Sequence, residues 1–214
     1  MRIAFQGETG SPGEAAAERV DAAAERLACR TFEDVFEAVE HRAATWGVLP
    51  LESSIAGTMF RQYDLLVQHA LSIVGEVEVP GDALGLGPLA RAVRDADDPL
   101  TRFIVVGRQP LPHRVSDKTT IVFSLRNEPG ALFRALGAFA LRDVDLAKLE
   151  SRPVKGRPWE SLFYADLAAS RDELACAHAL QHLADLAATF RILGSYQAWR
   201  GRELRPADPF EVCA

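Results

Sequence analysis

Two short segments in the second half of the chain carry residues suited to binding a free amino acid. They are Asn127–Leu132 (NEPGAL) and Glu150–Pro153 (ESRP). A glycine that opens a helix permits close backbone approach, and the unpaired N–H groups of the first helical turn suit a carboxylate. Leu132 can add an apolar wall, while the charged residues of the second segment can orient a ligand or pair subunits. Taken singly, the first segment is better explained as a turn and the second as a solvated ion pair. Together they favour an amino-acid site.

A second group of polar residues follows an apolar run in the first half of the chain. Residues 46–51 are apolar and lead directly into Glu52, Ser53 and Ser54. In α/β folds, ligands bind where strands end, so this pattern predicts a buried strand that opens onto a functional loop. The glycines at 7, 10 and 13 lack the spacing of a dinucleotide fingerprint, so a structural turn is as good an explanation as an anion site.

Cysteines and histidines predict no metal centre and no disulfide framework. Cys29, Cys176 and Cys213 are far apart and lack C-x-x-C spacing. His178 and His182 lie four residues apart on an expected helix, but no third ligand accompanies them. We therefore expect neither a metal nor a cofactor.

Composition and charge exclude several classes of partner. The 214 residues have a formal net charge of −6, and no apolar run is long enough for a membrane-spanning helix. Such a chain should attract neither nucleic acid nor an anionic membrane surface. The start of the chain also lacks the apolar segment of a signal peptide, so a cytoplasmic location is expected.

The first half of the chain alternates strands with helices, which predicts an α/β unit with a mostly parallel sheet. Periodicity predicts strands at 2–6, 46–51, 71–79 and 103–106, and helices at 14–28, 32–40, 63–70 and 89–95. Thr31 followed by Asp34 predicts a capping box for the second helix. The proline-containing stretch from Gln109 has the stiff character of a linker.

The second half predicts a four-stranded antiparallel sheet with two helices on one face. Strands are expected at 121–125, 145–152, 160–167 and 190–199, with helices near 131–140 and at 171–188. Their order is βαββαβ, a ferredoxin-like α+β arrangement. The expected domains are residues 1–108 and 117–203, with a linker at 109–116 and a tail at 204–214.

On these motifs the chain resembles the prephenate dehydratases, whose regulatory ACT domain carries similar "GAL" and "ESRP" segments in a βαββαβ order. The first half is similar to the same family in its Gly7–Glu14, Asp34–Glu40, Pro50–Gly57, Tyr63–Leu66, Ile73–Val77 and Thr101–Phe103 segments. The resemblance implies that the two ACT motifs meet across a dimer interface and enclose phenylalanine. The contacts implied are Asn127, Gly130, Ala131, Leu132, Glu150, Ser151 and Arg152.

The resemblance also implies that part of the catalytic region is missing. The family has two lobes resembling periplasmic binding proteins, with the active site between them, and its second lobe would fall between Val79 and Thr101. Here only residues 80–100 stand in that place. We therefore expect a single, truncated lobe. Because the lobe is an insertion between two strands, its loss is compatible with folding.

Three residues of the first lobe are implied as catalytic. Thr101 matches the family's catalytic threonine, and Glu52 matches an acidic residue that precedes an asparagine, which is Ser53 here. Thr101 could position a leaving hydroxyl, and Arg102 could pair with a carboxylate. An ordinary strand start with a surface arginine explains the pair equally well.

Three hypotheses about function remain open from the sequence. The chain could be a dehydratase of prephenate or arogenate, inhibited by phenylalanine and assembled as a homodimer or dimer of dimers. It could instead be a catalytically impaired protein that senses phenylalanine and dimerises through its ACT domain. The third hypothesis is a dimerisation module with a vestigial ligand site.

Overall fold

The computed structural model describes residues 1–81, 100–109, 116–154 and 160–201. The chain divides into two compact units, which we consider one at a time. The first contains residues 1–109 and the segment that begins at Trp199, and the second contains residues 110–198. The expected helix at 89–95, most of the expected linker and the tail lie outside the described residues.

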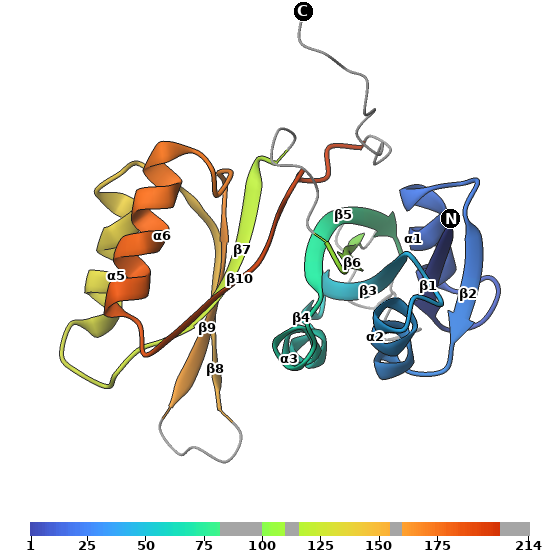
Figure 1. Ribbon diagram of the computed structural model, residues 1–214, viewed down its shortest axis with the longest axis horizontal. Helices are drawn as coiled ribbons and strands as arrows, with labels where there is room; N and C mark the ends of the chain where they lie inside the picture. Colours follow the sequence, from blue (N-terminus) through green and yellow to red (C-terminus); the bar gives the residue numbers. More distant parts are fainter. Residues whose placement is uncertain (82–99, 110–115, 155–159, 202–214) are drawn as a thin grey trace, which may run out of the picture. The chain divides into compact units, whose positions relative to one another are not determined.

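The first unit is a mixed sheet with helices on both faces (Figure 1). In chain order its elements are β1 (Arg2–Gln6), α1 (Pro12–Val20), β2 (Glu25–Cys29), α2 (Phe32–Glu40), β3 (Trp46–Ser53), β4 (Gly57–Thr58), α3 (Phe60–Gln68), β5 (Ser72–Pro80) and β6 (Leu100–Gly107). The strand order is β2-β1-β3-β6-β5, and β4 pairs with β3. β1 pairs with β2 and β3 in parallel, whereas β6 runs antiparallel between β3 and β5. The expected α/β class is thereby confirmed, although the sheet is mixed and not mostly parallel as predicted, because β6 runs antiparallel to both of its neighbours.

The two N-terminal helices of this unit begin at side-chain caps. Ser11 caps α1 by accepting a hydrogen bond from the N–H of Glu14, and Thr31 and Asp34 form the predicted capping box of α2. The expected helix at 14–28 is wrong in its second half. α1 ends at Val20, and residues 25–29 form β2 in parallel register with β1.

β5 and β6 are direct antiparallel neighbours, so the segment that connects them starts and ends at the same edge of the sheet. Val79 pairs with Thr101 and Pro80 pairs with Leu100, so the two chain ends that flank the expected second lobe lie side by side. An insertion between adjacent strand ends changes the closing entropy only slowly with its length. This geometry explains how the sheet can close with or without a long insertion.

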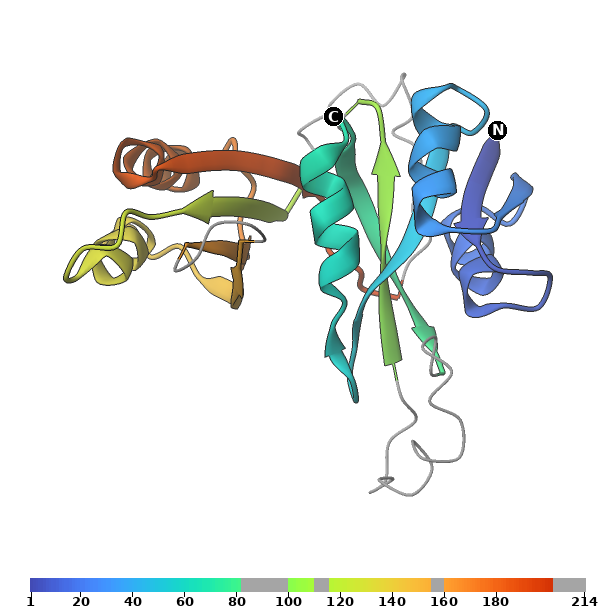
Figure 2. The same ribbon diagram turned by 90° about the horizontal axis from the view of Figure 1, so that it is seen from below.

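The second unit is a four-stranded antiparallel sheet with two helices on one face, as predicted (Figures 1 and 2). Its elements are β7 (Lys118–Ser124), α5 (Ala131–Ala140), β8 (Leu146–Pro153), β9 (Ser161–Leu167), α6 (Leu174–Leu186) and β10 (Thr189–Tyr196). The strand order is β10-β7-β9-β8, so β8 is an edge strand. This is the expected ferredoxin-like α+β fold.

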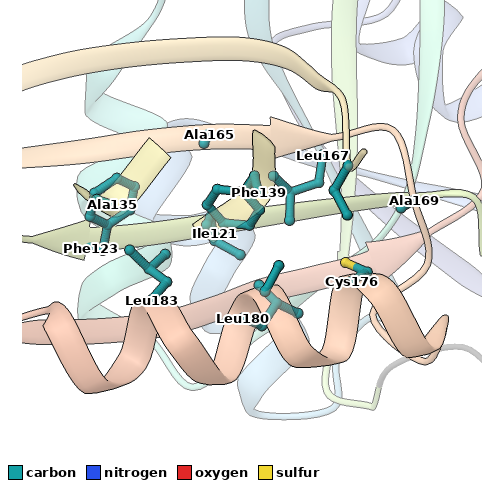
Figure 3. Close-up of a cluster of buried hydrophobic side chains, with 12 residues drawn as sticks. Ile121, Phe123, Ala135, Phe139, Ala165, Leu167, Ala169, Cys176, Leu180 and Leu183 are labelled. Carbon is teal, nitrogen blue, oxygen red and sulfur yellow. The ribbon is translucent and has the colours of Figure 1, made fainter. Parts of the chain in front are cut away.

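The core of the second unit lies between the helices and the sheet (Figure 3). Phe139 of α5 and Leu183 of α6 are fully buried against Ile121 and Phe123 of β7. Phe123 also stacks on Phe163 of β9, with ring centroids 5.3 Å apart. These apolar contacts fix α5 and therefore the position of the predicted ligand loop that precedes it.

No helix in the described ranges is long and apolar enough to cross a membrane. Within the same ranges, no three His, Cys, Asp or Glu side chains come together as a group that could hold a metal ion.

Candidate functional site

The sheet edge at which β1, β2 and β3 end holds the three residues of the first unit that were predicted as catalytic. β6 runs in the opposite direction, so its first residues lie at this same edge beside the end of β3. A pocket of about 560 Å³ opens here, lined by Gln6, Gly7, Glu8, Thr9, Ala28, Cys29 and Arg30. In open α/β sheets this edge is where ligands bind. The pocket is thus a candidate ligand site, and only its glycine loop stood out in the sequence.

Thr101 and Ser53 are cross-strand neighbours at this edge. Ser53 pairs with Thr101 in the β3–β6 register, and both side chains are buried. The Thr101 hydroxyl donates a hydrogen bond to the carbonyl of Gly81 over 3.0 Å. The Ser53 hydroxyl accepts from the N–H groups of Ile55 and Ala56, at 3.3 Å each. The Ser53 hydroxyl therefore stabilises the turn after β3.

Glu52 belongs to an ion-pair network on the other face of the sheet. It pairs across the strands with Arg102, whose guanidinium also contacts Glu76 of β5, with 3.4 Å between Nη1 and Oε2. Because successive residues of a strand face opposite sides, this network and the Ser53–Thr101 pair lie on different faces. The structure thus places the three residues predicted as catalytic at one edge but on two faces, and their role stays a prediction.

Sequence reasoning missed the part that Glu76 plays in this network. The residue is only 4% exposed, whereas the other charged residue of the same strand, Glu78, is half-buried. A buried carboxylate needs compensating partners, and here a guanidinium and a backbone N–H supply them. A charged residue within the mostly apolar run 73–79, which also contains Glu78, was the signal that could have identified it.

In the second unit, the loop before α5 has the geometry expected of a carboxylate site. Gly130 is the N-cap in the left-handed conformation (φ 76°), and no side chain caps the helix. The N–H of Ala131 donates to the carbonyl of Glu128 over 3.1 Å, so the first-turn N–H groups that could serve a ligand or water are those of Leu132 and Phe133. Asn127 and Leu132 are exposed, and Ala131 is half-buried. A small pocket of about 190 Å³ adjoins this loop and is lined by Leu125, Arg126, Glu128, Ala131, Arg134, Asp185, Leu186 and Ala187.

The second predicted ligand segment lies on β8, the edge strand. Leu149 and Ser151 pair with the core-facing residues Ala165 and Phe163, so they face the helices. Glu150 and Arg152 face the opposite side, where Glu150 approaches Lys148 at 3.4 Å. A pocket of about 560 Å³ lies between α5 and β8, lined by Leu136, Ala140, Asp143, Val144, Asp145, Leu146 and Leu149. It offers an apolar surface one helical turn beyond Leu132.

The two described cysteines are free thiols in environments that disfavour the thiolate. Burial, with Glu173 and Asp172 adding to it, raises the pKa of Cys176 to about 11. Burial and then Asp34 raise the pKa of Cys29 above its ordinary value. Since only the thiolate is nucleophilic, neither residue is suited to covalent catalysis near neutral pH.

We expect Cys176 to react with iodoacetamide at pH 8 at least about a hundredfold more slowly in the folded protein than in urea. Cys29, which is half-buried beside a pocket, should react faster than Cys176. Peptide mass spectrometry after timed labelling measures each residue separately. Equal labelling of Cys176 in the folded and unfolded protein would contradict the raised pKa.

Comparisons with known proteins point to one family. The family model for prephenate dehydratase matches residues 3–84. A curated relative, arogenate dehydratase/prephenate dehydratase 2 of Arabidopsis thaliana, is 32% identical over 92% of this chain and 72% of its own length. A solved prephenate dehydratase from Arthrobacter aurescens in complex with L-Phe is 26% identical, with a TM-score of 0.77 over 97% of this chain and 92% of its own.

A further solved structure, described as GqqA, a quorum quenching acylase, is similar to the same extent. It is 30% identical, with a TM-score of 0.77 over 98% of this chain and 96% of its own.

Proposed function

The chain belongs to the prephenate and arogenate dehydratase family, and from that premise we propose that it is a phenylalanine-regulated dehydratase of phenylalanine biosynthesis. The reaction converts prephenate to phenylpyruvate, water and CO2. One observation carries the proposal: the likeness to the Arthrobacter enzyme bound to L-Phe extends over 97% of this chain and so includes both units. We propose residues 1–108 as the catalytic lobe and 117–203 as the regulatory domain.

The proposed chemistry needs a proton for the leaving hydroxyl and a site that holds carboxylates away from water. We propose that the Thr101 side chain positions the leaving hydroxyl of the substrate, at the sheet edge that Thr101 shares with Ser53 and Glu52. Arg102 follows Thr101 in β6 and could pair with a substrate carboxylate, but it already contacts Glu52 and Glu76. A substrate carboxylate would therefore have to compete with these two carboxylates, which favours weak substrate binding.

The proposed phenylalanine site uses the two motifs of the second unit. The N-terminus of α5 at Gly130 would receive the carboxylate, and the apolar surface of Leu132, Leu136 and Leu149 would receive the ring. We propose that Asn127–Leu132 of one chain faces Glu150–Arg152 of a second chain. The protein would then be a homodimer, or a dimer of dimers, with a two-fold interface.

A second candidate is a phenylalanine-binding regulatory protein without turnover. The alignment with the Arabidopsis relative spans 276 positions, whereas 92% of the 214 residues is about 197, so about 79 positions have no counterpart here. A deficit of this size between the directly paired β5 and β6 would remove the opposite wall of a two-lobed cleft. Water exclusion, on which the dehydration depends, would suffer most.

Likeness to the acylase does not separate these candidates. That protein is as similar in structure to this chain as the Arthrobacter enzyme is, so similarity in fold is compatible with more than one chemistry. Acyl-amide hydrolysis is therefore included as an additional activity to be measured.

Turnover and binding, measured on the same preparation, distinguish the candidates. Purified protein is incubated with prephenate, and separately with arogenate, with and without phenylalanine, while formation of the product is followed. Calorimetry on the same preparation then measures phenylalanine binding. Turnover that phenylalanine suppresses supports the regulated dehydratase. Binding with no product at any enzyme concentration supports the sensor instead. Absence of both would refute both proposals.

The assembly has its own measurement. A two-fold site shared between chains predicts at least a dimer by light scattering. A monomer that still bound phenylalanine would refute the shared site.

A further inference from the structure

Glu76 contacts two different parts of the first unit. Its Oε2 lies 3.4 Å from Nη1 of Arg102, and its Oε1 accepts a hydrogen bond from the backbone N–H of Trp199 over 3.0 Å. The carboxylate is almost completely buried, so both contacts are made away from bulk water, where charge-assisted hydrogen bonds are strong. A movement of Arg102 or of Trp199 would therefore be transmitted to the other residue through the Glu76 side chain.

Trp199 occupies a particular place in the chain. β10 ends at Tyr196, and only two residues separate it from Trp199. Ala198, the last residue of the second unit, is anchored there because its N–H donates to Asp117 over 2.6 Å. Trp199, the next residue, belongs to the first unit and donates to Glu76. Two consecutive N–H groups thus tie the chain to an acidic residue of each unit.

The other end of the Glu76 contact reaches the predicted catalytic residues. Arg102 pairs with Glu52 across the strands, and the residue before it in β6 is Thr101. A continuous series of contacts therefore runs from the Trp199 N–H through Glu76 and Arg102 to Glu52. Since β6 is hydrogen-bonded to both β3 and β5, a shift of Arg102 would be shared with its backbone neighbours.

We propose that Glu76 is a positioning residue that couples the state of β10, through the Trp199 N–H, to Arg102 and the start of β6. The proposal rests on the proposed function in one respect, namely that phenylalanine is the ligand of the second unit. Phenylalanine binding to the second unit shifts the segment after β10. This shift changes the hydrogen bond from the Trp199 N–H to Glu76 and therefore the position of the Arg102 guanidinium. The coupling acts through the Trp199 backbone and does not need the indole ring.

Three variants separate the Trp199–Glu76 hydrogen bond from the Glu76–Arg102 ion pair. Trp199→Pro removes the N–H donor, whereas Trp199→Ala keeps it and removes only the side chain. Glu76→Gln keeps an acceptor for Trp199 but removes the charge that faces Arg102. If Trp199→Pro does not fold, Glu76→Met takes its place, because it removes both acceptor oxygens at similar size.

The measurement is backbone hydrogen exchange of β6 in the full-length protein, with and without saturating phenylalanine. In the wild type and Trp199→Ala, phenylalanine should change exchange of the β6 amides at least about fivefold. Trp199→Pro should still bind phenylalanine by calorimetry, yet show no such change. Glu76→Gln should keep the change in the segment around Trp199 and lose most of it in β6.

Each outcome decides the proposal. An equal β6 response in Trp199→Pro and Trp199→Ala, or no response in a wild type that binds phenylalanine, overturns it. Absence of phenylalanine binding overturns it together with the ligand assignment. A β6 response without any prephenate turnover leaves the coupling standing and refutes only the dehydratase.

Discussion

Replacing Arg102 by alanine is expected to lower the free energy of unfolding of the first unit by about 3–5 kcal/mol. The side chain of Arg102 is only 14% exposed and that of Glu76 only 5%, so the variant would leave a buried carboxylate without its guanidinium. The loss of a partner in a buried pair is costly because the remaining charge keeps its desolvation penalty. Urea unfolding followed by circular dichroism measures the change.

Arg61→Ala is the matched control for this variant. Arg61 also pairs with a glutamate, Glu33, but its side chain is 64% exposed, and exposed ion pairs contribute about 0–1 kcal/mol. A double variant, Arg102→Met with Glu76→Gln, should recover much of the lost stability because it removes both charges. Equal effects of Arg102→Ala and Arg61→Ala would show that the network is not a buried one.

The element order was largely predictable because it depends on local periodicity, but one strand was not. The alanine-rich stretch 14–28 favours helix by propensity alone. In the structure the Asp21 side chain accepts the N–H of Ala23 in a tight turn after α1, and β2 then pairs with β1. Tertiary pairing overrides helix propensity here, and the sequence of a single segment does not contain that information.

The location of the candidate site was predictable, but its internal geometry was not. The polar residues Glu52 and Ser53 lie at the end of the strand that the apolar run 46–51 predicted, and their functional role stays a prediction. Which face each residue occupies depends on a register shift between Pro50 and Glu52 in the β3–β6 pairing. A one-residue shift moves every later side chain to the other face, and the local sequence pattern does not predict where such a shift occurs. Glu52 and Ser53 face opposite sides in any register because they are adjacent in a strand, whereas their pairing with Arg102 and Thr101 depends on this shift.

The second large effect is expected in α5, where two phenylalanines of one helix differ completely in environment. Phe139 is fully buried in the core of Figure 3, whereas Phe133 is 81% exposed. Phe139→Ala should lower the free energy of unfolding of the second unit by about 3–5 kcal/mol, through lost burial and the cavity left behind. Thermal and urea unfolding of the full chain measure this loss.

Phe133→Ala serves as the control for Phe139→Ala and also tests the proposed assembly. In an isolated chain the substitution should change the free energy of unfolding by less than about 0.5 kcal/mol, because the ring is already mostly exposed to water in the folded state. If a second chain covers the N-terminal half of α5, the same substitution should instead lower the dimer affinity, so that unfolding becomes more dependent on protein concentration. Because both variants remove the same atoms from the same helix, helix propensity contributes equally to each. Equal losses for the two variants at low protein concentration would therefore contradict the burial of Phe139, whereas a loss for Phe133→Ala that appears only at concentrations where wild type dimerises would identify α5 as part of the interface.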